Sequence, residues 1–394
     1  MNRQQLTLLL VLGVVLGGLG FYVYNKKQSS YERGPADGDG QKLLQGVPPS
    51  AINDVTQMII KQGTGAVTLA RQGEQWTVQE RGGYPANFVT ISDTVKKLWD
   101  LKITRPVEVG PSRLPHLKLT KTDGTLLDLQ DDKGKSIVAL TLGLQSAKEM
   151  REDAQFGGGA FPNGRYVMRG DDLKTVALVS DPLSIEAKPE DWLSKDWFKV
   201  EKVKSVAVAG PVATNNWKLA RETETGEWKL AEAKPGEMMD NGKASGLNWL
   251  LSAPAFNDVV IDPVPEKTGL DQATTATVET FDGFTYTFKL GQMPGGEENH
   301  ALQLKVAGNF PAERVAGKDE KPEDKTRLDR EFADNRKKLD DKLKNEKTFE
   351  KWTYVVSKWT VENLLKERKD FLADKKDEAK KDAALPPNFN IPGQ

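Results

Sequence analysis

The sequence predicts an α+β fold of two related, mainly antiparallel sheet-plus-helix repeats behind one N-terminal transmembrane helix. Three observations support this prediction: a long uncharged segment at the N-terminus, motifs that recur about 150 positions apart, and short β patterns that accompany one helical stripe in each copy. At 394 residues, the chain also exceeds the usual size of a single hydrophobic core.

The N-terminal segment predicts a membrane anchor at residues 1–24. From Leu6 to Tyr24 the chain carries no charge, and as a helix this stretch would span roughly 28 Å, close to the thickness of bilayer hydrocarbon. It ends in aromatic residues that suit the headgroup region, and no small-residue cleavage site follows. We therefore expect a retained helix in contact with the lipid bilayer rather than a cleaved signal peptide.

The segments that flank the folded region predict its location. The tail before the anchor is only five residues long, and large domains translocate largely regardless of charge. We therefore expect a single-pass protein of the inner (cytoplasmic) membrane, with most of the chain on the extracytoplasmic, periplasmic side. Residues 25–50 read as a flexible linker and residues 374–394 as a disordered tail.

The motif pairs divide the rest into a first repeat at 51–200 and a second at 201–373. A Leu-Ala-Arg that starts at Leu69 recurs at Leu219, and a Trp-x-aliphatic that starts at Trp76 recurs at Trp228. Each copy then predicts a helix, from the stripe Ile91, Val95, Leu98 and Trp99 or from Ala244, Leu247 and Leu251, with Asp240 as N-cap of the second. Hairpins are expected around Asp123-Gly124 and Asp282-Gly283, and closing strands at 165–168 and 352–356.

A charged insertion at about 318–350 interrupts the second repeat before its last strand. Its sparse apolar stripe and its charges of both signs predict a long solvated helix, lying on its own sheet or serving as a partner-binding arm. Acid-first pairs four residues apart should stabilise it: Glu323–Arg327, Asp334–Lys338 and Asp340–Lys344. The candidate partner surface combines the stripe with two tryptophans of the bridge between the repeats: Leu328, Phe332, Leu339, Leu343, Trp192 and Trp197.

The landmarks of the second repeat resemble the bacterial family called domain of unknown function 4340. They are Trp228-Lys229-Leu230, Gly269-Leu270-Asp271, Asp282-Gly283 and Leu290-Gly291. The first repeat departs from the pattern, with Arg113-Leu114 in place of Gly-Leu and an elongated loop at 155–164. The resemblance covers the chain from about Val55 to Leu372. It implies an extracytoplasmic accessory of an ABC-type transporter, and it carries over no catalytic residue.

The composition excludes several chemistries. A net charge of −1 gives no basic face for nucleic acid, and the absence of cysteine excludes disulfides and thiolate nucleophiles. Gly134-Lys135-Ser136 lacks the upstream glycine of a phosphate-binding loop and reads as a hairpin turn. Only His116 and His300 could serve a histidine-based site. We therefore predict no catalytic residue, no cofactor and no metal.

The leading functional hypothesis is a non-catalytic accessory or scaffold protein that contacts a membrane protein, for example ABC transporter subunits or an envelope assembly. The alternative is an envelope-polymer (glycan) binding module, with Trp192, Trp197, Trp217 and Trp228 as an aromatic platform rather than as core residues. A hydrolase is a third and less favoured hypothesis, because nucleophile and acid–base signatures are lacking.

Overall fold

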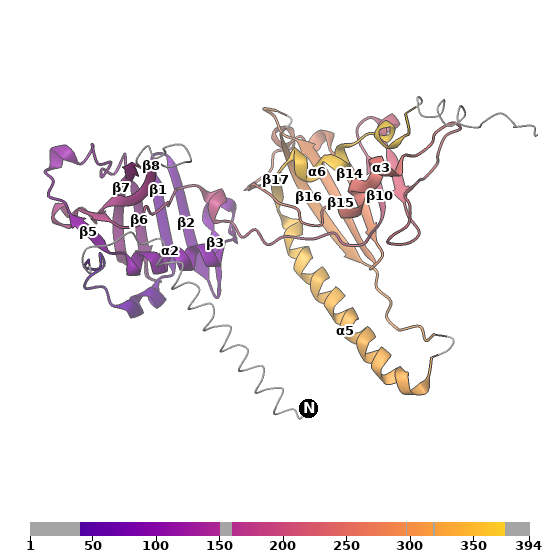
Figure 1. Cartoon of the computed structure of the whole chain (residues 1–394), viewed down its shortest axis with the longest axis horizontal. Helices are drawn as coiled ribbons and strands as arrows, with labels where there is room; N and C mark the ends of the chain where they lie inside the picture. Colours follow the sequence, from indigo (N-terminus) through magenta and orange to yellow (C-terminus); the bar gives the residue numbers. More distant parts are fainter. Residues whose placement is uncertain (1–39, 150–159, 297, 318–319, 375–394) are drawn as a thin grey trace, which may run out of the picture. The chain divides into compact units, whose positions relative to one another are not determined.

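The computed structural model describes residues 40–149, 160–296, 298–317 and 320–374 (Figure 1). Two mainly antiparallel sheets with a few helices make up this part, which confirms the α+β class. The predicted anchor at 1–24, the linker as far as residue 39 and the tail from 375 onward lie outside the described residues. Within the described ranges, no helix is both long enough and apolar enough to cross a membrane.

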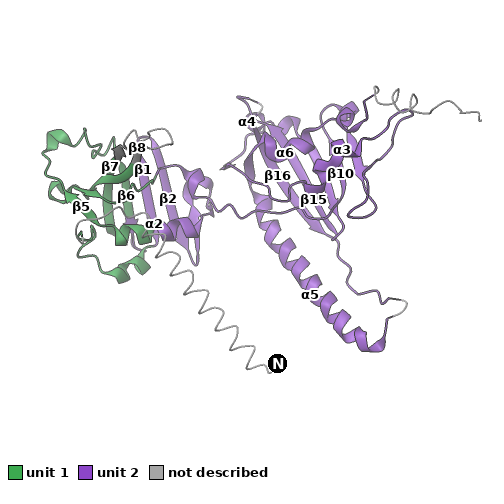
Figure 2. Ribbon diagram, in the orientation of Figure 1, with its two compact units in different colours: residues 1–55, 94–128, 135–185 green, residues 56–93, 129–134, 186–394 purple. Residues whose placement is uncertain are grey.

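Contacts divide the chain into two compact units (Figure 2). Unit 1 contains residues 1–55, 94–128 and 135–185, and unit 2 contains residues 56–93, 129–134 and 186–394. The strands β1 to β4 are therefore grouped with the second half of the chain.

The first sheet has nine strands in the order β4-β3-β2-β1-β6-β7-β8-β9-β5. Polar and apolar residues alternate along its strands, so one face of a strand is buried and the other is not. In β1, Met58 and Ile60 are fully buried, whereas Lys61, which follows Ile60, is exposed. The strand bounds are β1 Gln57–Gln62, β2 Gly65–Gln72, β3 Gln75–Val78, β4 Tyr84–Pro85, β5 Ile103–Pro106, β6 Thr125–Gln130, β7 Ser136–Glu149, β8 Ala160–Arg169 and β9 Ala177–Val179.

Helix α2, at Phe88–Asp100, follows β4. The predicted helical stripe is its buried face, because Ile91, Val95, Leu98 and Trp99 are all at most 8% exposed. The side-chain amide oxygen of Asn87 accepts a 3.2 Å hydrogen bond from the Thr90 backbone N–H, which caps the first turn.

The second sheet has eight strands in the order β12-β11-β10-β14-β15-β16-β17-β13. The strand bounds are β10 Val203–Ala209, β11 Trp217–Ala220, β12 Lys229–Leu230, β13 Asp258–Val260, β14 Thr274–Thr280, β15 Phe284–Gln292, β16 Asn299–Gly308 and β17 Thr353–Ser357. The helices of this half are α3 Asn241–Ala244, α4 Pro265–Thr268, α5 Pro322–Lys347 and α6 Lys358–Leu365.

The predicted second helix is shorter than its stripe. Asp240 caps α3 as expected, accepting a 2.8 Å hydrogen bond from the Gly242 N–H. After Ala244 the chain tightens into a 3₁₀ helix at Ser245–Trp249. Ala244, Leu247 and Leu251 are nevertheless buried. Ala244 and Leu247 are three residues apart, which is one full 3₁₀ turn, whereas Leu251 follows the end of the 3₁₀ helix.

The two sheets have the same strand order. When β4 is left out, β1, β2, β3, β5, β6, β7, β8 and β9 occupy the same places in the first sheet as β10 to β17 occupy in the second. A helical segment also lies between the third and fourth strands of this series in each half: α2 lies between β3 and β5, and α3 lies between β12 and β13. In the first half, the additional strand β4 precedes the helix. The motif pairs of the sequence therefore coincide with a repeated topology.

Two local predictions for the first repeat are wrong. Asp123-Gly124 precedes β6 and joins no paired strands, whereas the β6–β7 turn is at Asp131–Lys135, where Gly134 has φ +74°. The segment 165–168 lies in β8, so the counterpart of β17 is β9, which is only three residues long. In the second sheet, Gly283 forms the β14–β15 hairpin turn with φ +88°, as predicted.

Candidate functional site

The C-terminal end of α5 is held by a buried carboxylate. Glu346 is 4% exposed, and its Oε2 accepts a 2.7 Å hydrogen bond from the Tyr286 hydroxyl of β15. Its Oε1 accepts a 3.1 Å hydrogen bond from the backbone N–H of Lys199. Burial, reinforced by the adjacent negative charge of Glu346, raises the pKa of Tyr286 well above its usual value. The last turn of α5 is therefore tied to the second sheet at a site that excludes water.

A lysine one turn earlier adds charge to this attachment. The Lys342 ammonium donates to the Lys199 carbonyl at 2.8 Å and to a Glu201 carboxylate oxygen at 2.7 Å. It also lies 3.5 Å from a Glu346 oxygen. The hydrogen bond from Lys342 lowers the pKa of Glu201. Together with Glu346, these contacts fix the C-terminal half of the helix.

The other end of α5 is bound mainly by its own charges and by the segment before it. Arg336 donates to the carbonyls of Phe310 and Pro311 at 3.1 and 2.9 Å, and Arg314 forms an ion pair with Asp329 and another with Glu320. Among the described residues, none of the predicted acid-first pairs is formed. The helix instead pairs a base with an acid four residues later: Lys325–Asp329, Arg327–Glu331, Arg330–Asp334, Arg336–Asp340 and Lys342–Glu346.

The predicted apolar stripe of α5 is half-buried along its length. Leu328, Phe332, Leu339 and Leu343 all have intermediate exposure. Leu343 packs against β16, because a side-chain carbon added to Gly308 would come within 2.9 Å of it. The C-terminal end of the stripe therefore lies toward the sheet.

An aromatic cluster lies in unit 2, close in space to the attachment of α5, because one cavity is lined by rings of this cluster and by Lys199 and Asn345. Tyr84 of β4 makes edge contacts with Phe256, Trp352 and Tyr354 at ring-centroid distances of 5.7, 5.1 and 6.1 Å. Trp197 contacts Phe256 and Tyr354 at 5.1 and 4.7 Å. Burial raises the pKa of Tyr84 to about 12.

A cavity of about 840 Å³ opens beside these rings. Its lining combines aromatic side chains with charged ones and includes Tyr84, Trp197, Phe349, Trp352, Lys195 and Lys351. The indole N–H of Trp197 is buried, and among the described residues it has no hydrogen-bond acceptor. This volume lies within the range of small-molecule sites.

One lysine of the cavity is partly withdrawn from water. The Lys195 ammonium lies 4.5 Å from the centre of the Phe256 ring and donates to the Asn257 carbonyl at 3.2 Å. Burial lowers the pKa of Lys195, whereas nearby carboxylates oppose that shift. The arrangement places a cation beside an aromatic face at the edge of the cavity.

Arg81, which precedes β4, forms a bidentate ion pair with Asp258 of β13; this pair is called the Arg81–Asp258 fork. Arg81 donates to the two carboxylate oxygens of Asp258 at 2.6 and 2.7 Å and lies 3.3 Å from a Glu190 oxygen. The hydrogen bond to Asp258 raises the pKa of Arg81. Both members of the bidentate pair are at most 28% exposed, so solvent screens the pair only in part.

The tryptophans proposed for a partner or glycan surface are buried. Trp192 and Trp197 are 4% and 9% exposed, and Trp217 and Trp228 are both 3% exposed. The exposed tryptophans are instead Trp249, after α3, and Trp359 in α6, at 78% and 76%. Sequence reasoning did not single these two out, because no neighbouring pattern distinguishes an outward from an inward tryptophan.

The structure does not bring together the residues that the sequence offered for catalysis or for binding a metal or phosphate. His116 is exposed before β6, and His300 is buried in β16. Among the residues that the structure describes, no group of three or more histidine, aspartate or glutamate side chains could hold a metal ion. The Gly134-Lys135-Ser136 segment is the β6–β7 turn, as predicted. Tyr84, Arg81, Lys195 and Glu346 were missed, since each derives its environment from residues distant in sequence.

More than half of the chain matches a known protein family. Residues 76–291 match the family described as Domain of unknown function (DUF4340). The match begins at Trp76 in β3 and ends at Gly291 in β15, so it includes strands of both sheets. No curated protein matches the chain.

Proposed function

The chain belongs to the DUF4340 family, and from that premise and the geometry of α5 we propose that it is an accessory or scaffold protein without catalytic activity. In this proposal, residues 6–24 anchor it in the inner membrane and the folded part stands on the extracytoplasmic side. Its partner is a membrane protein, such as a subunit of an ABC-type transporter or of an envelope assembly.

The attachment of α5 is the observation that carries the proposal. The helix contains 26 residues and is therefore roughly 39 Å long. Glu346 and Lys342 fix one end to the second sheet, whereas side chains such as Arg330 and Lys338 remain exposed farther along. A long helix that is fixed to the sheet at one end and to the preceding segment farther along presents its charged face in a defined direction. Such a face favours recognition of a charged partner over catalysis.

The common strand order supports a second part of the proposal, namely that the two halves arose by duplication of one sheet-plus-helix unit. A scaffold gains from duplication because one copy can acquire an insertion while the other keeps the fold. The insertion between β16 and β17, which contains α5, has no counterpart between β8 and β9, where the only regular structure is a short 3₁₀ helix at Leu173–Thr175.

Photo-crosslinking tests the proposal in native membranes. A photoreactive amino acid at Arg330 or at Lys338 should crosslink the same membrane protein, identified by mass spectrometry. The matched control is Lys218, an exposed residue of β11 on the second sheet, which should give no such product. Recovery of the uncrosslinked protein alone from both helix positions would contradict the proposal.

The exposed tryptophans favour one alternative, an envelope-polymer (glycan) binding module. Trp249 and Trp359 can stack on sugar rings, whereas the four tryptophans named earlier are buried. The test is retention of the full chain by purified cell-wall polymer. Loss of retention in W249A and W359A, with retention kept in K218A, would favour this alternative over the accessory role.

A further inference from the structure

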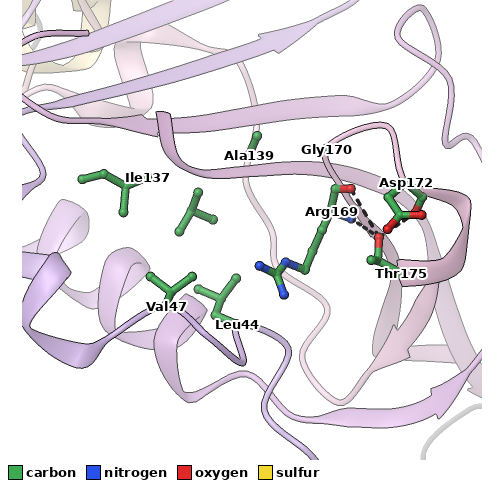
Figure 3. A pocket seen from close by; sticks show the side chains of 9 residues that line it. Leu44, Val47, Ile137, Ala139, Arg169, Gly170, Asp172 and Thr175 are labelled. Carbon is green, nitrogen blue, oxygen red and sulfur yellow. Dashed lines mark hydrogen bonds between the residues drawn. The ribbon is translucent and has the colours of Figure 1, made fainter. Parts of the chain in front are cut away.

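A second cavity, of about 420 Å³, lies in unit 1 (Figure 3). Leu44 and Val138 of its wall are buried, and Val47 and Ile137 are half-buried. Figure 3 shows the aliphatic side chains gathered on one side of the cavity, with Arg169 extending toward them from the end of β8. The volume lies within the range of small-molecule sites.

The Arg169 guanidinium has only part of its hydrogen-bonding capacity in use. Its Nη1 donates to the Gln45 carbonyl at 3.2 Å. Within the described ranges, it makes no other side-chain hydrogen bond and no ion pair. The Nε and Nη2 edge of the fork is therefore unoccupied by any described residue, beside an apolar wall.

The one carboxylate in the lining does not neutralise this charge. Asp172 uses its Oδ1 to accept a 3.0 Å hydrogen bond from the Lys174 N–H, capping the 3₁₀ helix at Leu173–Thr175. Figure 3 shows Asp172 next to Thr175, at the backbone end of Arg169 and away from the guanidinium. Arg169 is half-buried, so its charge still contacts solvent, and an anion that enters the cavity would find a guanidinium edge for which no described carboxylate competes.

We propose that this cavity binds a small carboxylate with a short straight apolar tail. The carboxylate would accept two parallel hydrogen bonds from Nε and Nη2 of Arg169, a geometry that guanidinium groups favour. The tail would lie against Leu44, Val47 and Val138. The hydrogen bond from Nη1 to Gln45 would remain, so binding requires no rearrangement of the segment before β1.

Hexanoate is the probe, titrated by calorimetry into the full chain in nanodiscs of zwitterionic lipid, with empty nanodiscs subtracted. We expect saturable binding of one hexanoate per chain. Acetate, which lacks the tail, and 1-hexanol, which lacks the charge, should each bind at least about tenfold more weakly.

Two variants separate the site from the stability of the fold. R169Q should weaken hexanoate binding at least about tenfold, whereas R113Q, at an exposed arginine outside the cavity, should leave it within about twofold. V47F places a ring at a half-buried position of the apolar wall and should weaken hexanoate binding at least about tenfold while the guanidinium is kept. Absence of saturable binding in the wild type, or wild-type binding in R169Q and V47F variants that remain folded by circular dichroism, would overturn the proposal.

Discussion

The Tyr286 hydroxyl donates a 2.7 Å hydrogen bond to Oε2 of Glu346, and this pair joins the central strand β15 to the last turn of α5. Tyr286 is fully buried and Glu346 is 4% exposed. A carboxylate is rarely buried unless its oxygens are paired, and here both oxygens accept hydrogen bonds. The orientation of α5 therefore depends on a pair of residues far apart in the sequence.

Replacing Glu346 with alanine should lower the free energy of unfolding by about 1–3 kcal/mol, because the Tyr286 hydroxyl and the Lys199 N–H lose their acceptor in a buried site. Urea unfolding measures the change. E331A, at an exposed position on the same helix, should cost no more than about 0.5 kcal/mol. Equal effects of the two substitutions would contradict the role assigned to Glu346.

Alkaline pH should destabilise the fold in part through Tyr84. Its pKa is raised to about 12 by burial, whereas an unfolded tyrosine ionises near 10. Between these pH values the unfolded chain loses a proton that the folded chain retains. The free energy of unfolding should therefore fall by about 1.4 kcal/mol per pH unit for this residue. Y84F should have a shallower decline between pH 10 and 12 in urea titrations, and an unchanged slope would disprove the assignment.

The Arg81–Asp258 fork should be energetically coupled. In a double-mutant cycle with R81A and D258A, the combined loss of stability should differ from the sum of the single losses by about 0.5–3 kcal/mol. The exposed pair Lys229–Glu222 is the control and should show no measurable coupling in the same unfolding assay. Additive effects at Arg81 and Asp258 would show that the fork does not act as a unit.

Acid titration should detect the pair between Arg368 and Glu237. Hydrogen bonds from Arg368 hold the Glu237 pKa at about 2, with a further contribution from the Lys234 N–H. The stability from this pair is present above about pH 4.5 and is lost as pH falls toward 2. R368Q should raise the Glu237 pKa toward 4.5 in a carboxyl ¹³C NMR titration. R330Q, on the exposed face of α5, should leave it unchanged.

Local patterns predicted the elements whose burial follows from their own residues. The stripe from Ile91 to Trp99 predicted α2, and Asp240 predicted the cap of α3, since periodicity and capping are properties of neighbouring positions. The recurrent Leu-Ala-Arg and Trp-x-aliphatic motifs pointed to two similar halves, and the two sheets have the same strand order.

Features that depend on distant partners could not be predicted in this way. Nothing around Tyr84 indicates that three rings from the second half surround it. The three residues of β9 are too few to show an alternating pattern, which explains why 165–168 was mistaken for the closing strand. On α5, two of the five base-first pairs contain Arg336 or Lys342, which are also held by backbone carbonyls of segments that the helical pattern does not include.

The central claim is a retained anchor with the folded part outside the cytoplasm, and the absence of cysteine allows a direct measurement. Single cysteines at Lys338 and at Asn2 can be labelled with a membrane-impermeant maleimide in cells with a permeabilised outer envelope. We expect K338C to be labelled before lysis and to stay in the membrane fraction after carbonate extraction, whereas N2C should be labelled only after lysis. Protection of K338C until lysis, or its release as a soluble protein, would disprove an anchored protein with its folded part outside the cytoplasm.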